Sequence, residues 1–238
     1  LTGVTLYEPE ELVLSAKAGT PIAEIEALLD QNNQQLAFEP ADYGALFGAP
    51  AGQGTLGGVA AANLSGPRRI KAGAARDHVL GITAVTGRAE TIKTGGRVVK
   101  NVTGYDLCKV LCGSWGTLAA MTDITVKVLP KPETEATVVV EGLSDAQACA
   151  AMTAATGSSA DVSGAAHLPD HVASWFAGLK AEAATVLRLE GVAPSVQHRE
   201  GQLAALMKTF GPVSIFDAAA SRAVCAAEPG ASFAGPRP

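Results

Sequence analysis

The chain is 238 residues long, 47% of them hydrophobic and 5% aromatic, and it carries a formal net charge of -5. That length allows one large domain or two modest ones, and the hydrophobic share favours a packed core over global disorder. A net negative chain without a block of Lys and Arg does not indicate a nucleic-acid-binding protein. Because the chain has no run of 18 apolar residues and no signal peptide, we expect no integral membrane protein and, by default, a cytoplasmic location.

Cysteine and histidine spacing gives no indication of a metal site. The four cysteines are scattered, so we expect reduced thiols rather than metal or iron–sulfur ligands: Cys108, Cys112, Cys149 and Cys225. His167 and His171 have the spacing of helical ligands, but Pro169 lies between them and no third ligand is evident. We therefore predict no metal, and no Ser-His-Asp or Cys-His group identifies a catalytic residue.

Both ends of the chain have unusual sequence. Residue 1 is Leu and lies in what reads as mid-domain sequence, while residues 228–238 are rich in Gly, Pro and Ala without a strand or helix period. We expect from this that the chain is incomplete at its N-terminus and also at its C-terminus.

Hydrophobic periodicity predicts strands and short helices over residues 1–131. Thr20 is the expected N-cap of a helix whose first residue is Pro21 and which ends near residues 32–33. The other elements follow from alternation, apolar spacing and turn residues. Strands are expected at 12–18, 36–38, 79–86, 89–93 and 121–129, and short helices within 59–66 and 105–112.

The pattern changes after Lys131 and Pro132, where we place a domain boundary. Strands at 136–141, 162–167, 185–190 and 213–216 alternate with helices at 144–155 and 194–210. This is the β-α-β-β-α-β order of a ferredoxin-like unit. Residues 218–238 are expected to form an irregular tail.

A glycine-rich stretch at residues 48–58 leads into the Ala-rich helix. It has two interpretations, since tight turns also need glycine for backbone reasons. It lacks the lysine of a P-loop and the spaced glycines of a nicotinamide-binding fingerprint. What it offers is free backbone N–H groups without side-chain bulk, on which a phosphate or a flat ring can lie, and Thr55 adds a hydroxyl.

Two further segments are candidates for the same site. The first, residues 67–81, contains four cations, which form either a solvated basic loop or a surface facing phosphates: Arg68, Arg69, Lys71 and Arg76. The second, residues 100–107, is a polar turn entering a helix, in which Tyr105 is either a core aromatic or a ligand contact. Trp115 and Trp175 are expected to be packing residues, and His78 either a structural residue or a base.

In combination, these motifs resemble the FAD-binding domains of the vanillyl-alcohol-oxidase type, also called PCMH-type. The resemblance is carried by Thr55-Leu56-Gly57-Gly58 with Asn63 and Gly66, by Arg76-Asp77-x-Val79-Leu80-Gly81, by residues 100–107, and by 113–118. Within that group the chain is most similar to the FAD-binding subunits of bacterial glycolate oxidases, on the runs 64–69 and 99–107. The resemblance covers about residues 6–142, and the second domain matches these proteins only in outline.

The resemblance implies an α+β fold in which non-covalent FAD lies between two subdomains. It divides the chain into an FAD-binding domain at 1–131 that lacks its N-terminal part, a ferredoxin-like cap fragment at 132–217 and the tail. The residues it places on the cofactor are Gly52, Thr55, Leu56, Gly57, Gly58, Asn63, Gly66, Gly73, Arg76, Asp77, Gly104, Tyr105, Asp106 and Ile124. Residues 104–106 would approach the isoalloxazine edge, and the backbone at Asp123–Ile124 the adenine end.

The resemblance also implies a function, the oxidation of a small 2-hydroxy acid, glycolate, to glyoxylate with electrons passing through FAD. The partners would be a second flavoprotein subunit and an iron–sulfur subunit, in a complex that can lie at the inner membrane. Since the upstream glycine loop and the C-terminal segment of such domains have no match here, the chain alone is expected to be inactive.

Two alternatives stay open. The chain is a structural or electron-relay subunit whose paralogue oxidises the substrate, or it belongs to another 2-hydroxy-acid or lactone oxidase of the same flavoprotein group. The small number of candidate acid–base residues favours the relay role, whereas a substrate-binding arginine or histidine in the cap would oppose it.

Overall fold

The computed structural model describes residues 1–44, 48–97, 105–170, 172–173, 179 and 183–225. The chain divides into two compact units, Leu1–Lys131 and Pro132–Pro238, each with its own hydrophobic core. None of the helices within these residues is long and apolar enough to cross a membrane.

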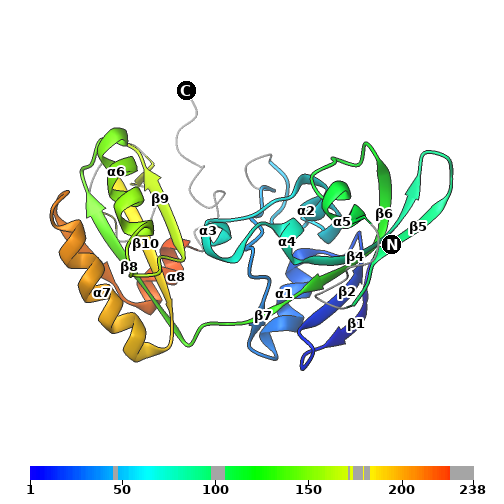
Figure 1. The fold of residues 1–238 in the computed structure, drawn as a ribbon, viewed down its shortest axis with the longest axis horizontal. Helices are drawn as coiled ribbons and strands as arrows, with labels where there is room; N and C mark the ends of the chain where they lie inside the picture. Colours follow the sequence, from blue (N-terminus) through cyan, green and yellow to red (C-terminus); the bar gives the residue numbers. More distant parts are fainter. Residues whose placement is uncertain (45–47, 98–104, 171, 174–178, 180–182, 226–238) are drawn as a thin grey trace. The chain divides into compact units, whose positions relative to one another are not determined.

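The first unit is built on a five-stranded antiparallel sheet (Figure 1). Its strands, in spatial order, are β1 (Val4–Glu8), β2 (Val13–Lys17), β6 (Ala119–Lys127), β4 (Val79–Thr86) and β5 (Thr91–Gly95). Successive side chains of a strand point to opposite faces, so Leu14 and Ala16 of β2 enter the core while Ser15 and Lys17 lie on the other face. The unit therefore has one apolar and one polar sheet face.

Short helices cover the apolar face, and their buried side chains complete the core. They are α1 (Ile22–Asp30), α2 (Leu56–Ala62), α3 (Arg69–Ala72), α4 (Ala75–His78) and α5 (Leu107–Leu111). Ile25 and Leu29 of α1 are fully buried, as is Leu56 of α2. A two-residue ladder joins β3 (Gln34–Gln35) to β7 (Leu129–Pro130).

Three details of this unit differ from expectation. Thr20 is not the N-cap, because its buried hydroxyl binds Gly3 instead, and the cap residue is Pro21, which has no side-chain bond. The strand expected at 36–38 lies at Gln34–Gln35, since Leu36 and Phe38 leave the ladder and enter the core. The strand β1 was not expected at all.

The second unit has a four-stranded antiparallel sheet in the order β11-β8-β10-β9, with α6 and α7 on one face (Figure 1). The chain order β-α-β-β-α-β is that of a ferredoxin-like unit. Its elements are β8 (Thr134–Glu141), α6 (Asp145–Thr156), β9 (Gly164–Leu168), β10 (Ala184–Gly191), α7 (Ala193–Met207) and β11 (Val213–Phe216). Small alanines of α6 and Leu203 and Met207 of α7 form the core against the sheet.

The prediction of an irregular tail is wrong for residues 218–225. Residues Ala218–Cys225 form the helix α8, because Asp217 accepts hydrogen bonds from the N–H groups of residues 219 and 220 and the sequence is rich in alanine. Ser221 of α8 is fully buried, and its hydroxyl lies 2.7 Å from that of Thr137 on β8. The remainder of the tail lies outside the described residues.

The Thr137–Ser221 pair gives a test of this packing. Thr137→Val should cost about 1–2 kcal/mol of the free energy of unfolding, because the Ser221 hydroxyl stays buried without its partner. Adding Ser221→Ala should restore most of the loss. The measurement is urea denaturation followed through the amide signals of β8. If the losses of unfolding free energy in the two single variants simply add in the double variant, a direct bond between these hydroxyls is contradicted.

Candidate functional site

The glycine-rich loop is held in a fixed form by side chains at both of its ends. Asp42 accepts hydrogen bonds from the N–H groups of Gly52, at 2.5 Å, and Gly44, at 2.9 Å. Thr55 is the N-cap of α2, and its hydroxyl accepts from the N–H of Gly58 at 3.2 Å. The backbone from 54 to 57 also pairs with residues 18–22, so the loop is anchored to the end of β2.

The glycine-rich loop offers open backbone donors at exposed and half-buried residues. Within the described part of the chain, the N–H groups of Gln53, Gly54 and Thr55 find no acceptor. Gly52 and Gly58 are exposed, and a Cβ added at Gly58 would meet only the Thr55 hydroxyl, at 3.4 Å. Successive unpaired N–H groups form an anion-binding surface, and the missing side chains let a ligand approach it closely. The loop thus fits a phosphate-bearing ligand.

Other glycines in the expected set are required by the fold itself. A Cβ at Gly57 would lie 2.8 Å from the carbonyl oxygen of Ala18, and one at Gly66 would lie 2.4 Å from that of Glu39. Gly73 has a φ of +89° beside Asp77. Close packing of the chain therefore explains why these three positions are glycine, and the glycines give no separate indication of a ligand.

Two residues of the expected set direct their side chains into the core. Leu56 and Ile124 are 1% and 0% exposed. Only their backbone groups are available for a cofactor.

Asn63 joins the loop to the basic segment. It closes α2 in the left-handed conformation, with a φ of 52°, and its side-chain oxygen accepts from the N–H of Arg76 at 2.9 Å. The ammonium group of Lys109 donates to the carbonyl oxygen of Arg76, which brings α5 to the same place. Asp77 caps this turn locally by accepting from the N–H of Ala74. The Arg76 side chain stays half exposed.

The basic segment is not simply a solvated loop. Arg68 donates its backbone N–H to Glu39 at 3.0 Å, and its guanidinium lies 3.6 Å from the same carboxylate. The two cations Arg69 and Lys71 are exposed on α3. One of the four cations is thus committed to structure.

The third expected segment is described only in part, since Gly104 lies outside the described residues. Asp106 caps α5, and its carboxylate accepts from the N–H of Lys109 at 3.3 Å. Tyr105 is 93% exposed, which rules out the core interpretation. The packing role expected for Trp115 is also wrong, because it is 74% exposed, and Trp175 is not among the described residues.

The structure adds to this group the turn at residues 113–116, which carried the resemblance in the sequence but was not among the expected cofactor residues. The N–H groups of Gly113 and Trp115 bind the carbonyl oxygens of Ala60 and Ala61, so the turn sits against the end of α2. The hydroxyl oxygen of Ser114 is buried and has no partner among the described residues. Gly113 and Gly116 of this turn have positive φ angles. Because glycine adopts such angles readily, the two glycines could have suggested a turn here.

Two buried titratable groups of the described residues, His78 and Cys112, lie in the core of the first unit. His78 is 1% exposed, and its Nε2 lies 2.8 Å from the carbonyl oxygen of Ala72, so that nitrogen carries the proton. Burial lowers the pKa of His78 and raises that of the Cys112 thiol to about 12. These groups are therefore neutral packing residues. Among the described residues, no cluster of His, Cys, Asp and Glu could hold a metal.

Comparison with known proteins gives the loop its context. Residues 1–95 match the family model described as an FAD binding domain. This stretch of the first unit therefore resembles an FAD-binding domain. This confirms the resemblance that the sequence motifs indicated.

Curated relatives match parts of the chain. Glycolate oxidase subunit GlcE of Escherichia coli is 45% identical over 130 residues, which is 55% of this chain and 35% of that protein. Glycolate oxidase subunit GlcD of Bacillus subtilis is 44% identical over 85 residues, or 36% and 18%. D-lactate dehydrogenase of Anaerostipes hadrus is 33% identical over 141 residues, or 58% and 28%. The chain thus spans about a third or less of these relatives.

Solved structures support the fold. A structure of alkyldihydroxyacetonephosphate synthase has a TM-score of 0.68 and 18% sequence identity, covering 90% of this chain and 41% of that chain. At this identity the likeness establishes a shared mixed α/β fold, and the sequence relatives establish kinship with glycolate oxidase subunits and D-lactate dehydrogenases.

His78 should make the stability of the first unit depend on pH. Its pKa is lowered in the folded state, so the unfolded chain binds more protons below the ordinary value of 6.5. The stabilisation is complete above about pH 6.5 and is lost as the pH falls, by at most about 1.4 kcal/mol per unit. Urea denaturation from pH 7.5 to 5, followed through amides of β4, measures this slope.

His78→Gln should flatten that slope, while His198→Gln, at an exposed position of α7, should leave it unchanged. An equal slope in the His78→Gln variant would assign the pH dependence to other groups.

Proposed function

We propose that this chain is the FAD-binding part of a subunit of a 2-hydroxy-acid oxidoreductase, with glycolate as substrate and glyoxylate as product. One observation carries the proposal. Within the described residues, the glycine-rich loop gives a surface with three successive unpaired N–H groups, at residues 53–55, between the exposed glycines Gly52 and Gly58. Such a surface suits the pyrophosphate of a dinucleotide, whose two negative charges need donors but no bulk.

The proposal gives the expected residues different tasks. Gly52, Thr55, Gly58 and Asn63 would face the pyrophosphate and flavin, because their outward surfaces are open or polar. Leu56, Gly57, Gly66, Gly73 and Ile124 would contribute through the backbone alone. Arg76, Asp77, Tyr105 and Asp106 would lie along the same path with Gly104, and we add Ser114, whose buried hydroxyl lacks a partner. No His or Cys stands at an obvious attachment point, so FAD would be held non-covalently.

FAD bound there would supply the hydride-accepting chemistry for oxidation at the carbon that bears the substrate hydroxyl. The residues of this chain would bind and orient the cofactor and exclude water from its phosphates. The substrate hydroxyl proton needs a base, and His78 cannot serve because it is buried and its free nitrogen lies in the core. We therefore place the base outside the described residues of this unit.

Residues 132–217 would be the ferredoxin-like cap fragment of the enzyme, and α8 would continue it. The ferredoxin-like order of the second unit supports this assignment. In the complete complex the partners would be a second flavoprotein subunit and an iron–sulfur subunit that takes up the electrons, at the cytoplasmic side of the inner membrane.

A second function has its own support. The match to D-lactate dehydrogenases covers 58% of the chain, which is as much as the match to the glycolate oxidase subunit. A different 2-hydroxy acid, D-lactate, is therefore the alternative substrate. A relay role without substrate oxidation is supported by the burial of His78. Turnover of the assembled complex with glycolate and with D-lactate would decide between these functions.

FAD titration of the purified chain tests the cofactor site. We expect a perturbed visible spectrum and quenched flavin fluorescence at micromolar FAD. Gly58→Ala should weaken binding by about tenfold, because a methyl group fills the open surface without meeting the protein more closely than 3.4 Å. The free energy of unfolding should stay unchanged or rise slightly, since Gly58 is helical.

Two matched variants complete the design. Gly201→Ala in α7, where an added Cβ meets nothing within 4 Å, should neither weaken FAD binding nor destabilise the fold. Gly66→Ala should lower the free energy of unfolding by several kcal/mol, because its Cβ collides with a backbone oxygen. Equal FAD affinity in the wild-type and Gly58→Ala chains would contradict the assignment of the loop.

A further inference from the structure

The polar face of the five-stranded sheet carries a pocket that the FAD site does not use. Its volume is about 260 Å³, and side chains from all five strands and the segment after β5 line it. Those that matter are Thr5, Ser15, Thr83, Lys93, Arg97 and Thr125. The glycine-rich loop lies with α2, whose buried residues join the core on the apolar face, so the pocket is on the opposite face.

Backbone features open this hollow. Gly81 lines the pocket without a side chain, and a Cβ there would lie 2.9 Å from the carbonyl oxygen of Gly96. The pairing of β4 with β6 shifts register beside Gly81, which bends the strand. Gly96 donates its N–H to Leu80, which holds the segment carrying Arg97 against the edge of β4. The hollow is thus a fixed part of the sheet.

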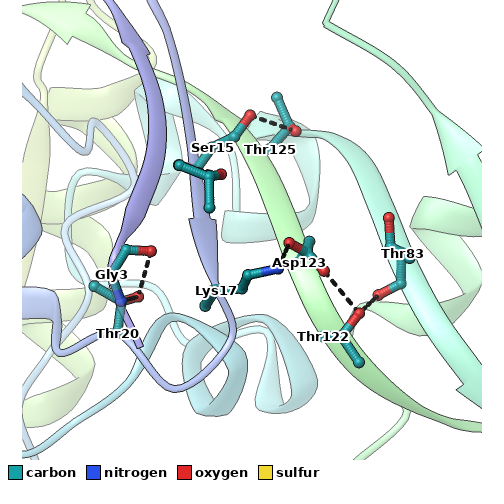
Figure 2. Close-up of polar contacts among 9 residues, drawn as sticks. Gly3, Ser15, Lys17, Thr20, Thr83, Thr122, Asp123 and Thr125 are labelled. Atoms are coloured by element: carbon teal, nitrogen blue, oxygen red, sulfur yellow. Dashed lines mark hydrogen bonds and ion pairs between the residues drawn. The ribbon is translucent and has the colours of Figure 1, made fainter. Parts of the chain in front are cut away.

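The acidic group in the pocket is already neutralised. Asp123 accepts from the ammonium group of Lys17 at 2.5 Å and from the hydroxyl of Thr122 at 2.8 Å, and Thr122 lies against the carbonyl of Thr83 (Figure 2). The hydrogen bond from Lys17 lowers the pKa of Asp123, so the carboxylate is ionised and paired. The Lys17–Asp123 pair therefore adds no net charge to the pocket.

Two cations remain. Within the described part of the chain, neither Lys93 nor Arg97 forms an ion pair with a carboxylate. Both are exposed at the pocket rim, on β5 and just after it. They give the pocket an excess of two positive charges, and a concave site concentrates that field.

Hydroxyl groups on the other four strands line the rest of the pocket. The Ser15 and Thr125 hydroxyls lie 2.8 Å apart, so one donates to the other and one proton is left for a ligand (Figure 2). The hydroxyl of Thr5 is bound to the carbonyl of Ser15, whereas that of Thr83 has no partner among the described residues. These hydroxyl groups therefore offer donors to a bound acceptor.

We propose that this pocket binds a small oxyanion, the carboxylate or phosphate group of a compact metabolite. Lys93 and Arg97 supply the charge, and the Ser15–Thr125 pair and Thr83 supply hydrogen bonds. The volume equals about eight water-sized groups at roughly 30 Å³ each, enough for one such group with a short carbon chain. The site is separate from the FAD loop and does not depend on the proposed function.

Titration of the full chain with inorganic phosphate and, separately, with oxalate tests this site, at an ionic strength held constant with sodium chloride. Calorimetry gives the affinity and amide NMR gives the location. We expect shifts at β5, Gly81 and Thr125 with at least one of the two anions, and the stronger one identifies the class. The double variant Lys93→Met, Arg97→Met should weaken binding by at least about tenfold.

Arg88→Met is the matched control, because Arg88 is an exposed cation at the turn of the same hairpin but does not line the pocket. It should leave the affinity unchanged. The proposal is overturned if neither anion shifts the pocket amides, if the double variant binds equally well, or if Arg88→Met weakens binding as much. Loss of FAD binding in the double variant would instead assign the pocket to the flavin site.

Discussion

The hydrogen bond from the N–H of Arg76 to the side chain of Asn63 is the contact on which the candidate site depends. Asn63 can accept it because the residue ends α2 in the left-handed conformation, which asparagine tolerates better than most side chains. The bond fixes the basic segment to the glycine loop, and Lys109 then fixes α5 to the basic segment. Three segments that are far apart in sequence thus form one surface through two short polar contacts.

The open backbone of the glycine loop was predictable from its composition. Glycine density indicated free N–H groups without side-chain bulk, with an ordinary tight turn as the alternative, and the structure has unpaired N–H groups there among the described residues. Spacing could not separate Gly58, which is open, from Gly66, which packs against Glu39, since both are glycines in one motif. Ser114 belonged to the motif at residues 113–118 but not to the expected cofactor residues, because its buried, unpartnered hydroxyl becomes visible only in three dimensions.

The fold followed from periodicity where packing agrees with it. The strand β4 and the helices α6 and α7 lie close to their expected places. The errors arise where a tertiary contact overrides the local signal. Thr20 has the type of an N-cap, but Gly3 takes its hydroxyl. The alanine-rich stretch after Asp217 was expected to be irregular, yet it forms a helix that packs on β8 through the buried hydroxyl pair of Ser221 and Thr137.

The two faces of the first sheet show how one strand can serve two sites. Ile124 and Val126 of β6 enter the core beneath the loop, while Asp123 and Thr125 point into the polar pocket. Because the side-chain period of a strand is two, a shift of one residue in register would exchange these sets and destroy both. The core thus fixes the register of β6, and the register in turn fixes which polar groups meet on the opposite face. Any ligand of that pocket is therefore coupled to the stability of the same strand.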